Sequence, residues 1–363
     1  MSNSLFVLRE LRVAQINRFN DYKYDGTVAF GEIKKDGAEV PNLDNCSANY
    51  RLMSAWGVFF LIIKKSYCTI EINEPFFLRS LNYQAAVWFA VWISKNIFFR
   101  KTKVVCYAIE NMDVILRSRN LLPIFGRGVE YVLKFFLGVS IGGIDKIAFG
   151  TLAAENNYKK YFSEKIKKID TRLVDSLEPI CEECCDLIKN KINMKFVFLG
   201  AFDDRKGIEH VMNIWPKIRA AYPDASLNII GDGPKKNQIF DWASKFDEVK
   251  VYVAPSAEII HGILSESVFL FLLSNETKSW KEQIGLPILE GLSHGCWIIS
   301  SDSTGISGWL EKNNNMIIST ESKNFADEVI KFIASKDGKI FDAKNILPKF
   351  SGRKIANDFL HHG

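Results

Sequence analysis

Short runs of apolar residues alternate with longer segments in which apolar positions recur every three or four residues, and this alternation continues through most of the chain. The short runs have the length of buried strands, and the longer segments have the period of amphipathic helices. Strands are expected at residues 5–8, 68–72, 103–109, 146–149, 195–200, 226–231, 249–253, 267–273, 297–300 and 316–318. Helical periodicity is found at about 47–65, between 75 and 96, at 128–138, 153–162 and 208–221, from 235 onwards, after 286 and at 350–360. Strands that alternate with helices predict parallel sheets of the α/β class.

Two stretches interrupt this alternation. Between residues 10 and 47 the pattern is weak, with neither a glycine-rich phosphate loop nor a clear helix. From residue 165 to about 191 the chain is polar, which is typical of a linker. Because 363 residues suit two cores better than one, we predict two doubly wound domains. The predicted division is 1–170 for the first domain, 171–193 for a linker, 194–345 for the second domain and 346–363 for a last helix.

The composition is that of a globular protein, with 47% hydrophobic and 25% charged residues. The N-terminus lacks the apolar segment of a cleavable signal, and the longest apolar stretches, 56–63 and 85–99, are shorter than the roughly 20 residues of a membrane span. Seven cysteines, an odd number, indicate reduced thiols. We therefore expect a cytoplasmic protein, with peripheral attachment at the inner face of the cell membrane left open.

The first half carries most of the basic surplus of this chain. Residues 95–172 contain 15 basic and 7 acidic side chains, and aromatic residues are dense between 76 and 136. A mixed basic and aromatic surface favours an anionic membrane over nucleic acid, because these aromatics recur at helical spacing and not in a strand motif that stacks on bases. An ordinary solvated basic face over an aromatic core explains the same pattern.

A cysteine cluster, Cys181, Cys184 and Cys185, offers thiol ligands. No second pair follows at the spacing of a zinc site, and no histidine is near it in the sequence. The sequence therefore does not predict a metal there.

The segment K-E-Q-I-G-L-P-I-L-E-G-L-S-H-G at 281–295 follows the strand expected at 267–273. Pro287 favours the first turn of a helix, and Gly285 allows a ligand to approach the backbone closely. Free amides at a helix start suit anionic or hydroxyl-rich ligands, and the carboxylates of Glu282 and Glu290 can accept hydrogen bonds from sugar hydroxyls. Alternatively, Glu282 is a solvated loop residue and Glu290 an ordinary helix surface residue.

The E-x(7)-E spacing within E-Q-I-G-L-P-I-L-E-G resembles the signature of retaining glycosyltransferases of the GT-B fold, particularly family 4. Three further features resemble that family in the right order: G-x-x-x-x-R-K-G at 200–207, I-I-G-D-G-P at 229–234 and H-G-C-W-I-I-S-S at 294–301. The resemblance covers the second half well and the first half in outline. It implies two Rossmann-like domains facing a central cleft, with the last helix crossing back to the first domain.

The resemblance also implies roles for individual residues. Arg205 and Lys206 would hold the donor diphosphate and stabilise the charge that develops on it, and Glu282 would hold the donor sugar. Glu290 would bind the ribose. The other donor contacts would come from Ile284, Gly285 and Leu286 at the sugar and from Gly231, Gly233 and Pro255 at the base. Ala201, Gln283 and Trp297 depart from the usual pattern.

Polar residues also follow two strands of the first half, with Glu74 after one and Glu110 and Asn111 after the next. Ligands bind at the carboxyl ends of parallel strands, so these side chains are candidates for function and Glu110 for catalysis. Turn formation and capping explain polar residues there equally well.

The five histidines, at 210, 261, 294, 361 and 362, all lie after residue 209. An inverting enzyme often takes a histidine base from the first domain, so their distribution agrees with retention, although Asp and Glu remain available. Asp203 and Asp204 adjoin Arg205 and are more simply paired or solvated than bound to a divalent metal. We expect metal-independent transfer with no cofactor.

The sequence thus predicts a retaining transferase that moves a sugar from a nucleotide diphosphate sugar to a saccharide or lipid-linked acceptor, as in cell-envelope polysaccharide assembly. Two alternatives remain. One is a scaffold that binds nucleotide sugar and assists a partner transferase, and the other is a nucleotide-sugar epimerase or hydrolase of the same fold.

Overall fold

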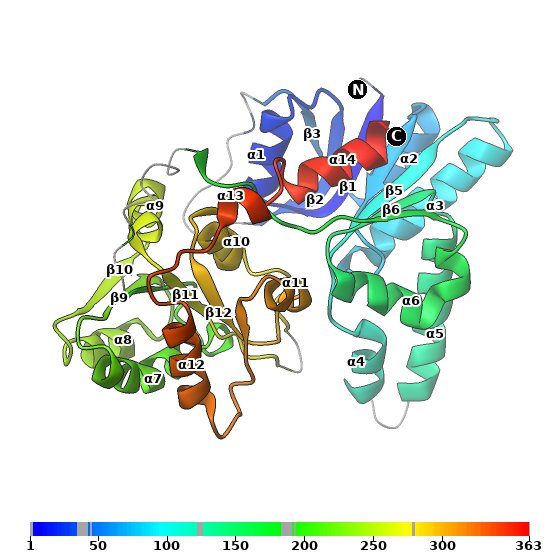
Figure 1. Ribbon diagram of the computed structural model, residues 1–363. Coiled ribbons are helices and arrows are strands. Elements are labelled where there is room, and N and C mark those ends of the chain that lie inside the picture. Colours follow the sequence, from blue (N-terminus) through cyan, green and yellow to red (C-terminus); the bar gives the residue numbers. More distant parts are fainter. Residues whose placement is uncertain are drawn as a thin grey trace. The chain divides into compact units, whose positions relative to one another are not determined.

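A computed structural model describes residues 3–34, 43, 46–121, 126–182, 191, 194–277 and 280–362. The chain forms two compact units. Unit 1 comprises Met1–Gly150, Ala154–Val174 and Ala356–Gly363, and unit 2 comprises Thr151–Ala153 and Asp175–Ile355. Each unit contains a parallel sheet with helices, as Figure 1 shows, which agrees with the predicted α/β class.

The sheet of unit 1 has seven parallel strands in the order β3-β2-β1-β4-β5-β6-β7. Their bounds are β1 Ser4–Leu11, β2 Thr27–Ile33, β3 Asn49–Leu52, β4 Thr69–Ile72, β5 Lys103–Ala108, β6 Lys146–Phe149 and β7 Asp170–Leu173. The order reverses between β1 and β4, so the carboxyl ends of these two strands mark the point where ligands of such sheets bind. Glu74 follows β4 directly at that edge.

The helices of unit 1 pack on the apolar faces of this sheet. They are α1 Val13–Asp21, α2 Ala55–Lys64, α3 Leu81–Asn96, α4 Val114–Leu121, α5 Gly126–Gly142 and α6 Leu152–Ile166. Ser54 caps α2, since its side chain accepts a hydrogen bond from the Gly57 amide at 3.2 Å. None of the described helices combines the length and the apolar character that a membrane span requires.

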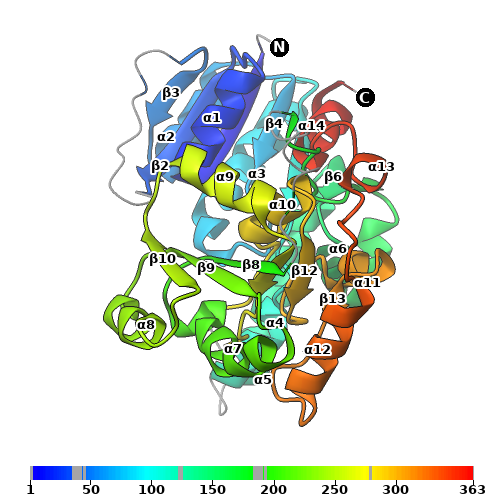
Figure 2. The same cartoon turned by 60° about the vertical axis from the view of Figure 1, so that its left-hand side comes forward.

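The sheet of unit 2 has six parallel strands in the order β10-β9-β8-β11-β12-β13, and Figure 2 shows most of them from the side. Their bounds are β8 Lys195–Leu199, β9 Ser226–Gly231, β10 Val249–Val253, β11 Phe269–Leu272, β12 Trp297–Ser300 and β13 Met316–Ile317. The helices are α7 Ile208–Ala221, α8 Lys236–Ala243, α9 Ala257–Glu266, α10 Leu286–Ser293, α11 Ser307–Lys312, α12 Phe325–Ser335 and α13 Ala343–Ile346. The order reverses between β8 and β11, so the loops after these two strands meet at the ligand-binding edge.

The last helix, α14 Gly352–His362, ends within unit 1. The side chain of His361 is buried there, with its ring stacked on Phe6 at 5.2 Å and its Nε2 atom 2.8 Å from the Glu71 carboxylate of β4. Lys146 of β6 donates a hydrogen bond to the Phe359 carbonyl at 2.9 Å. Strands and helix from opposite ends of the sequence therefore form one core.

Three sequence predictions about unit 1 are wrong. The segment at 47–65, for which helical periodicity was expected throughout, begins with the strand β3, and α2 starts only at Ala55. Residues 10–47 contain α1 and β2, although no clear helix was expected there. The polar stretch after residue 165 begins with an edge strand, β7, whose four side chains are all partly or fully exposed and so show no apolar run. The sequence also gave no signal for α4, α9 or α12.

Candidate active site

The loop after β8 is shaped by a carboxylate and a glycine. The Asp203 side chain accepts hydrogen bonds from the amides of Arg205 and Lys206, at 3.0 and 3.2 Å. Gly207 follows with φ +72°, and a Cβ atom there would lie 1.8 Å from the Leu273 carbonyl oxygen. The glycine thus lets the loop pack against the end of β11, which places Lys206 over that strand.

Lys206 and Glu282 form an ion pair at this edge, with Nζ and Oε2 2.5 Å apart. The same Glu282 oxygen accepts a hydrogen bond from the Ser274 hydroxyl at 3.1 Å. Both members of the pair are largely buried. The two residues that the motif assigns to the diphosphate and the sugar are therefore in direct contact.

Arg205 lies beside this pair and is more exposed. Its guanidinium bonds to Asp203 through Nε and NH2, at 3.1 and 2.5 Å. The ring of Trp280 lies 5.2 Å from the Arg205 guanidinium carbon and 5.2 Å from Lys206 Nζ. One indole thus contacts both cations, a cation–π arrangement that stabilises their position.

Asn275 joins the two loops, a role that the sequence did not predict. Its amide nitrogen donates to the Arg205 carbonyl and its side chain donates to the Asp204 carbonyl, each at 2.8 Å. Its side-chain oxygen lies 2.9 Å from His210 Nε2. The only sequence signal for such a connection between loops is an asparagine shortly after a buried strand. Asparagines are so common at this position that the signal does not identify the connection.

The segment before α10 is held by the loop after β12. The Thr304 hydroxyl donates to the Ile284 carbonyl at 2.5 Å, and the Gly305 amide donates to the Gln283 carbonyl at 2.9 Å. Gly285, with φ +89°, then starts the helix. The amides predicted to face the donor sugar are therefore on a fixed backbone, and the side chain of Leu286 is exposed beside them.

Glu290 lies on α10 and its side chain is open to solvent. Desolvation by surrounding protein raises the pKa of its carboxyl, and the nearby charge of His261 opposes that rise. Glu290 is the fifth residue of α10. Along the chain, the rest of the loop and the first turn of the helix lie between it and Glu282.

Gly231, the last residue of β9, and Gly233 allow other segments of the backbone to approach closely. A Cβ atom on Gly231 would lie 1.9 Å from the Gly200 carbonyl oxygen, and one on Gly233 would lie 2.8 Å from that of Phe202. Pro255 follows β10, the neighbouring strand. The residues predicted at the base therefore follow two adjacent strands.

Glu74 and Glu110 are neighbours in unit 1. The Glu74 carboxylate accepts hydrogen bonds from the amides of Ile109 and Glu110, at 3.1 Å each, and lies 3.4 Å from the Tyr158 hydroxyl. Burial, together with the Glu110 charge, raises the pKa of Glu74 to about 8. Glu110 itself accepts the Met112 amide at 2.9 Å, and Asn111 is buried beside it. Glu74 thus shapes the loop after β5, and Glu110 belongs to unit 1, whereas the other predicted site residues belong to unit 2.

No histidine is near Cys181 in the sequence, but the fold brings two histidines close to it. Its sulfur lies 3.9 Å from Nδ1 of His261, and His294 packs against His261. Burial lowers the pKa of His294 to about 4, so this imidazole is neutral at physiological pH. Cys184 and Cys185 lie outside the described residues.

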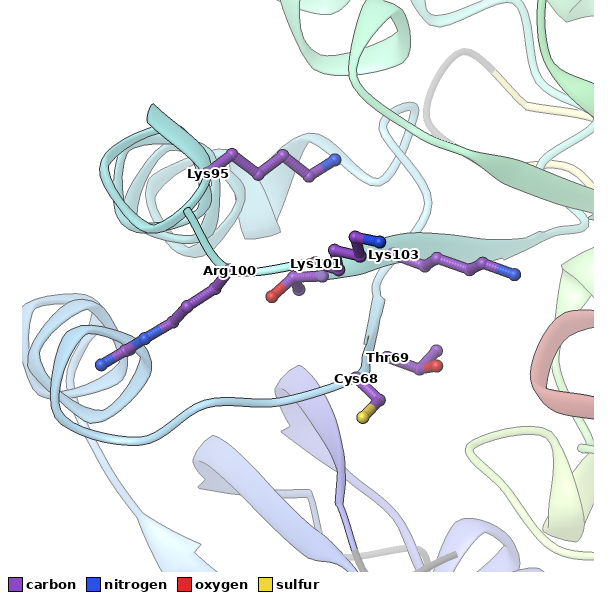
Figure 3. Close-up of a pocket in the computed structure, with 7 residues that line it drawn as sticks. Cys68, Thr69, Lys95, Arg100, Lys101 and Lys103 are labelled. Atoms are coloured by element: carbon purple, nitrogen blue, oxygen red, sulfur yellow. The ribbon is translucent and has the colours of Figure 1, made fainter. Parts of the chain in front are cut away.

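Unit 1 also has a basic cavity of about 500 Å³ at the opposite edge of its sheet, where β4 and β5 begin. Figure 3 shows its lining residues, which are Cys68, Thr69, Lys95, Arg100, Lys101, Thr102 and Lys103. Arg100 donates to the carbonyls of Ile62 and Ile63 in α2, and Lys95 pairs with Asp145 at 3.5 Å. Lys101 and Lys103 are exposed.

Known proteins resemble this chain in sequence and in fold. Residues 186–343 match the family model described as "Glycosyl transferases group 1". An uncharacterised glycosyltransferase of Haemophilus influenzae is 24% identical over 151 residues, which are 40% of this chain and 41% of that relative. The match thus spans about two-fifths of the relative's length.

Solved structures share the whole fold at low sequence identity. HepE of Anabaena, crystallised with UDP, has a TM-score of 0.66 and 12% identity over 99% of this chain and 96% of that one. A trehalose-phosphate synthase of Burkholderia vietnamiensis has a TM-score of 0.60 and 10% identity over 95% and 94%. WaaG, a lipopolysaccharide glycosyltransferase, has a TM-score of 0.54 and 11% identity over 99% and 100%. The predicted GT-B fold is confirmed.

Proposed function

We propose that the protein is a retaining glycosyltransferase that uses a nucleotide diphosphate sugar, from the premise that residues 186–343 match the glycosyl transferases group 1 model and that the chain has a GT-B fold. The observation that carries the proposal is the Lys206–Glu282 pair at the point where the unit 2 sheet reverses its strand order. The Haemophilus relative and the neighbours HepE and WaaG support the class of reaction.

Lys206 and Arg205 bind the donor diphosphate in this proposal. Both cations rest against Trp280, and Asp203 orients Arg205, so their charges are placed before a donor binds. Such preorganised cations stabilise the charge that grows on the diphosphate as the glycosidic bond breaks. Glu282 holds Lys206 in position and accepts a hydrogen bond from the donor sugar.

Glu290 accepts hydrogen bonds from the ribose hydroxyls, and the turn after β9 accommodates the base. Gly231 and Gly233 let this turn pack against the backbone of Gly200 and Phe202, which fixes its shape. Because HepE was crystallised with UDP and with UDP and glucose, UDP-glucose is the first donor to test. The binding residues act without a metal ion in this proposal, because Lys206 and Arg205 supply the positive charge.

Retention follows if the acceptor attacks from the same side as the leaving diphosphate. The sugar–phosphate bond then breaks as the acceptor oxygen bonds to the anomeric carbon, and a diphosphate oxygen takes the acceptor proton. Such a step needs no histidine base. The burial of His361 between Phe6 and Glu71 is consistent with this mechanism.

The acceptor in this proposal is a saccharide or lipid-linked saccharide of the cell envelope, reached at an anionic membrane surface. Support comes from a large exposed apolar surface on unit 1. Rings of α2 and α3 form a connected row, Trp56–Phe59–Phe89–Trp92, with successive centroids 6.0, 6.1 and 6.3 Å apart. Exposed apolar side chains continue over the end of α3 and α5 at Ile97, Phe98, Phe99, Tyr131, Val132, Phe135, Phe136 and Val139.

The positive charge next to this apolar surface favours a lipid bilayer as its binding partner. The basic cavity is lined by Lys95, near the end of α3, and by Lys101 and Lys103, which follow that helix (Figure 3). Apolar side chains bordered by lysines match an interface of acyl chains and anionic headgroups. We therefore place the protein at the inner face of the cell membrane as a peripheral protein.

The proposal is tested by incubating the protein with radiolabelled nucleotide sugars and a membrane extract that supplies acceptors. We expect one donor to label a saccharide or lipid product with the anomeric configuration of the donor retained. Free nucleotide without labelled product would support an epimerase or hydrolase instead. Nucleotide binding without turnover would support the alternative hypothesis of a scaffold that assists a partner transferase.

A further inference from the structure

Three side chains that the proposed transfer does not use meet near the end of α10. They are Cys181, His261 of α9 and His294. Each residue offers one ligand atom, and these three atoms lie within 4.8 Å of one another. The rings of His261 and His294 meet edge to face with centroids 4.9 Å apart. A thiolate and two imidazoles form a donor set that zinc prefers.

His294 is oriented in the manner of a metal ligand. Its Nδ1 atom donates a hydrogen bond to the Glu290 carbonyl oxygen at 2.7 Å, which assigns the proton to Nδ1 and leaves the lone pair on Nε2. His294 is only 2% exposed, and no described residue forms a hydrogen bond with Nε2. An unsatisfied buried nitrogen is costly, and a metal ion would satisfy it. Metal-binding histidines commonly donate their other nitrogen to a carbonyl or carboxylate in this way.

The other two donors are fixed by the backbone. The Cys181 amide donates to the Ser293 carbonyl at 2.9 Å, so Cys181 is tied to the residue before His294. His261 lies within α9. The Cys181 sulfur and His261 Nδ1 are 3.9 Å apart, and ligand atoms of a tetrahedral zinc site lie about 3.3–3.7 Å apart. Small side-chain rotations would therefore bring the three donors to one ion.

The charges near this cluster are compatible with a cation. Lys191 is the neighbouring cation among the described residues, and its ammonium donates to the carbonyls of Leu264 and Ser267. It also lies 3.5 Å from the Cys296 sulfur. The Glu290 carboxylate interacts with His261 from another side. Carbonyls and a thiol thus surround the lysine, and a carboxylate adds negative charge near the cluster.

We propose that Cys181, His261 and His294 bind one Zn²⁺ ion that fastens the chain entering unit 2 to α9 and to the end of α10. Three protein ligands leave one coordination position for a solvent molecule or another ligand. The site is separate from the Lys206–Glu282 pair and does not depend on the proposed transfer activity.

The test is a zinc titration of the chelator-treated full-length protein in reducing buffer against a chromophoric zinc indicator. We expect one Zn²⁺ per chain, and at least about a tenfold loss of affinity in Cys181→Ser and in His294→Ala. Cobalt added to the wild type should give a thiolate-to-metal charge-transfer band that Cys181→Ser lacks. Cys68→Ser and His362→Ala, which replace exposed residues, are the matched controls and should bind as the wild type does.

Circular dichroism establishes that each variant is folded, and His261→Ala, at a half-exposed position, replaces His294→Ala if the latter does not fold. Unchanged zinc affinity in Cys181→Ser and in the histidine variant would overturn the proposal. So would zinc binding that is lost only in Cys184→Ser or Cys185→Ser. A stoichiometry well above one ion, reduced equally by the control variants, would show an adventitious ion only.

Discussion

Lys206 and Glu282 are 76 residues apart in the chain, yet their charged atoms meet at 2.5 Å. The contact exists because β8 and β11 are neighbours in the sheet and each is followed by a loop at the same edge. An exposed pair of this kind would contribute little to stability. This pair is largely buried, with Ser274 on the carboxylate and Trp280 over the ammonium, so its geometry is fixed before a ligand binds.

Replacing Lys206 by alanine should impair transfer more than folding. Loss of one preorganised cation at the diphosphate should lower kcat/KM about 100- to 1000-fold. Glu282→Gln should lower it as well, because the amide holds Lys206 less tightly. Steady-state release of nucleoside diphosphate measures both effects. Lys217→Ala, an exposed lysine of α7, is the matched control, and equal rates in Lys206→Ala and Lys217→Ala would exclude Lys206 from the site.

Gly207→Ala should destabilise unit 2. The residue has φ +72°, and the added Cβ would lie 1.8 Å from the Leu273 carbonyl oxygen, so β11 and the Arg205–Lys206 loop must separate. Left-handed strain alone costs about 1–2 kcal/mol, and the clash adds to it. Urea unfolding measures the change. Gly308→Ala in α11, where the Cβ meets nothing within 4 Å, should be neutral or stabilising by up to about 1 kcal/mol, and similar losses in both variants would contradict the explanation.

Glu74 should make the stability of unit 1 depend on pH. Its pKa in the folded protein is about 8, above its ordinary value of 4.5, so between these pH values the folded state holds a proton that the unfolded state releases. Stability contributed by the protonated carboxyl is therefore present below about pH 4.5 and is lost as the pH rises to about 8. Thermal midpoints of the wild type and Glu74→Gln across this range measure the effect. As the pH rises, the wild type should lose more stability than the variant. Parallel curves for the two proteins would refute this role of Glu74.

Local patterns predicted the strands of unit 2 well because its central strands, β8, β11 and β12, are buried on both faces. Runs such as Phe269–Leu272 are continuous and apolar, and Gly207 and Gly285 lie where the backbone needs a positive φ. The weak segments of unit 1 have physical causes. α1 buries few side chains, Ile16 and Phe19 among them, and β7 is an edge strand with little apolar character.

Long-range contacts were beyond the sequence for a different reason. The motif named Lys206 and Glu282, but no spacing along the chain indicates that Asn275 ties their loops together. Cys181 and His261 are separated by 80 residues, so the cluster with His294 has no local spacing to recognise. The same holds for Glu71 and His361, which lie near opposite ends of the chain.

Membrane binding should depend on the exposed rings at the end of α3. Phe99 is 84% exposed and directly precedes Arg100, and Trp92 is 57% exposed and lies three residues before Lys95. Arg100 and Lys95 line the basic cavity. Phe99→Glu and Trp92→Glu each remove apolar area and add a charge that anionic headgroups repel. In flotation assays we expect the wild type to bind vesicles with anionic lipids, and each variant to bind several-fold more weakly. Phe240→Glu, at an exposed position of unit 2, is the control.

Salt and lipid composition then separate the two contributions to that binding. Added salt weakens the attraction between lysines and headgroups, because charges farther apart than about one Debye length, roughly 10 Å at 0.1 M, are largely screened, but it leaves apolar burial almost unchanged. The wild type should therefore bind more weakly at high salt and only slightly to zwitterionic vesicles, while Lys101→Ala with Lys103→Ala should lose most of the salt dependence. If Phe240→Glu weakens binding as much as Phe99→Glu does, the α3 surface is not what contacts the membrane.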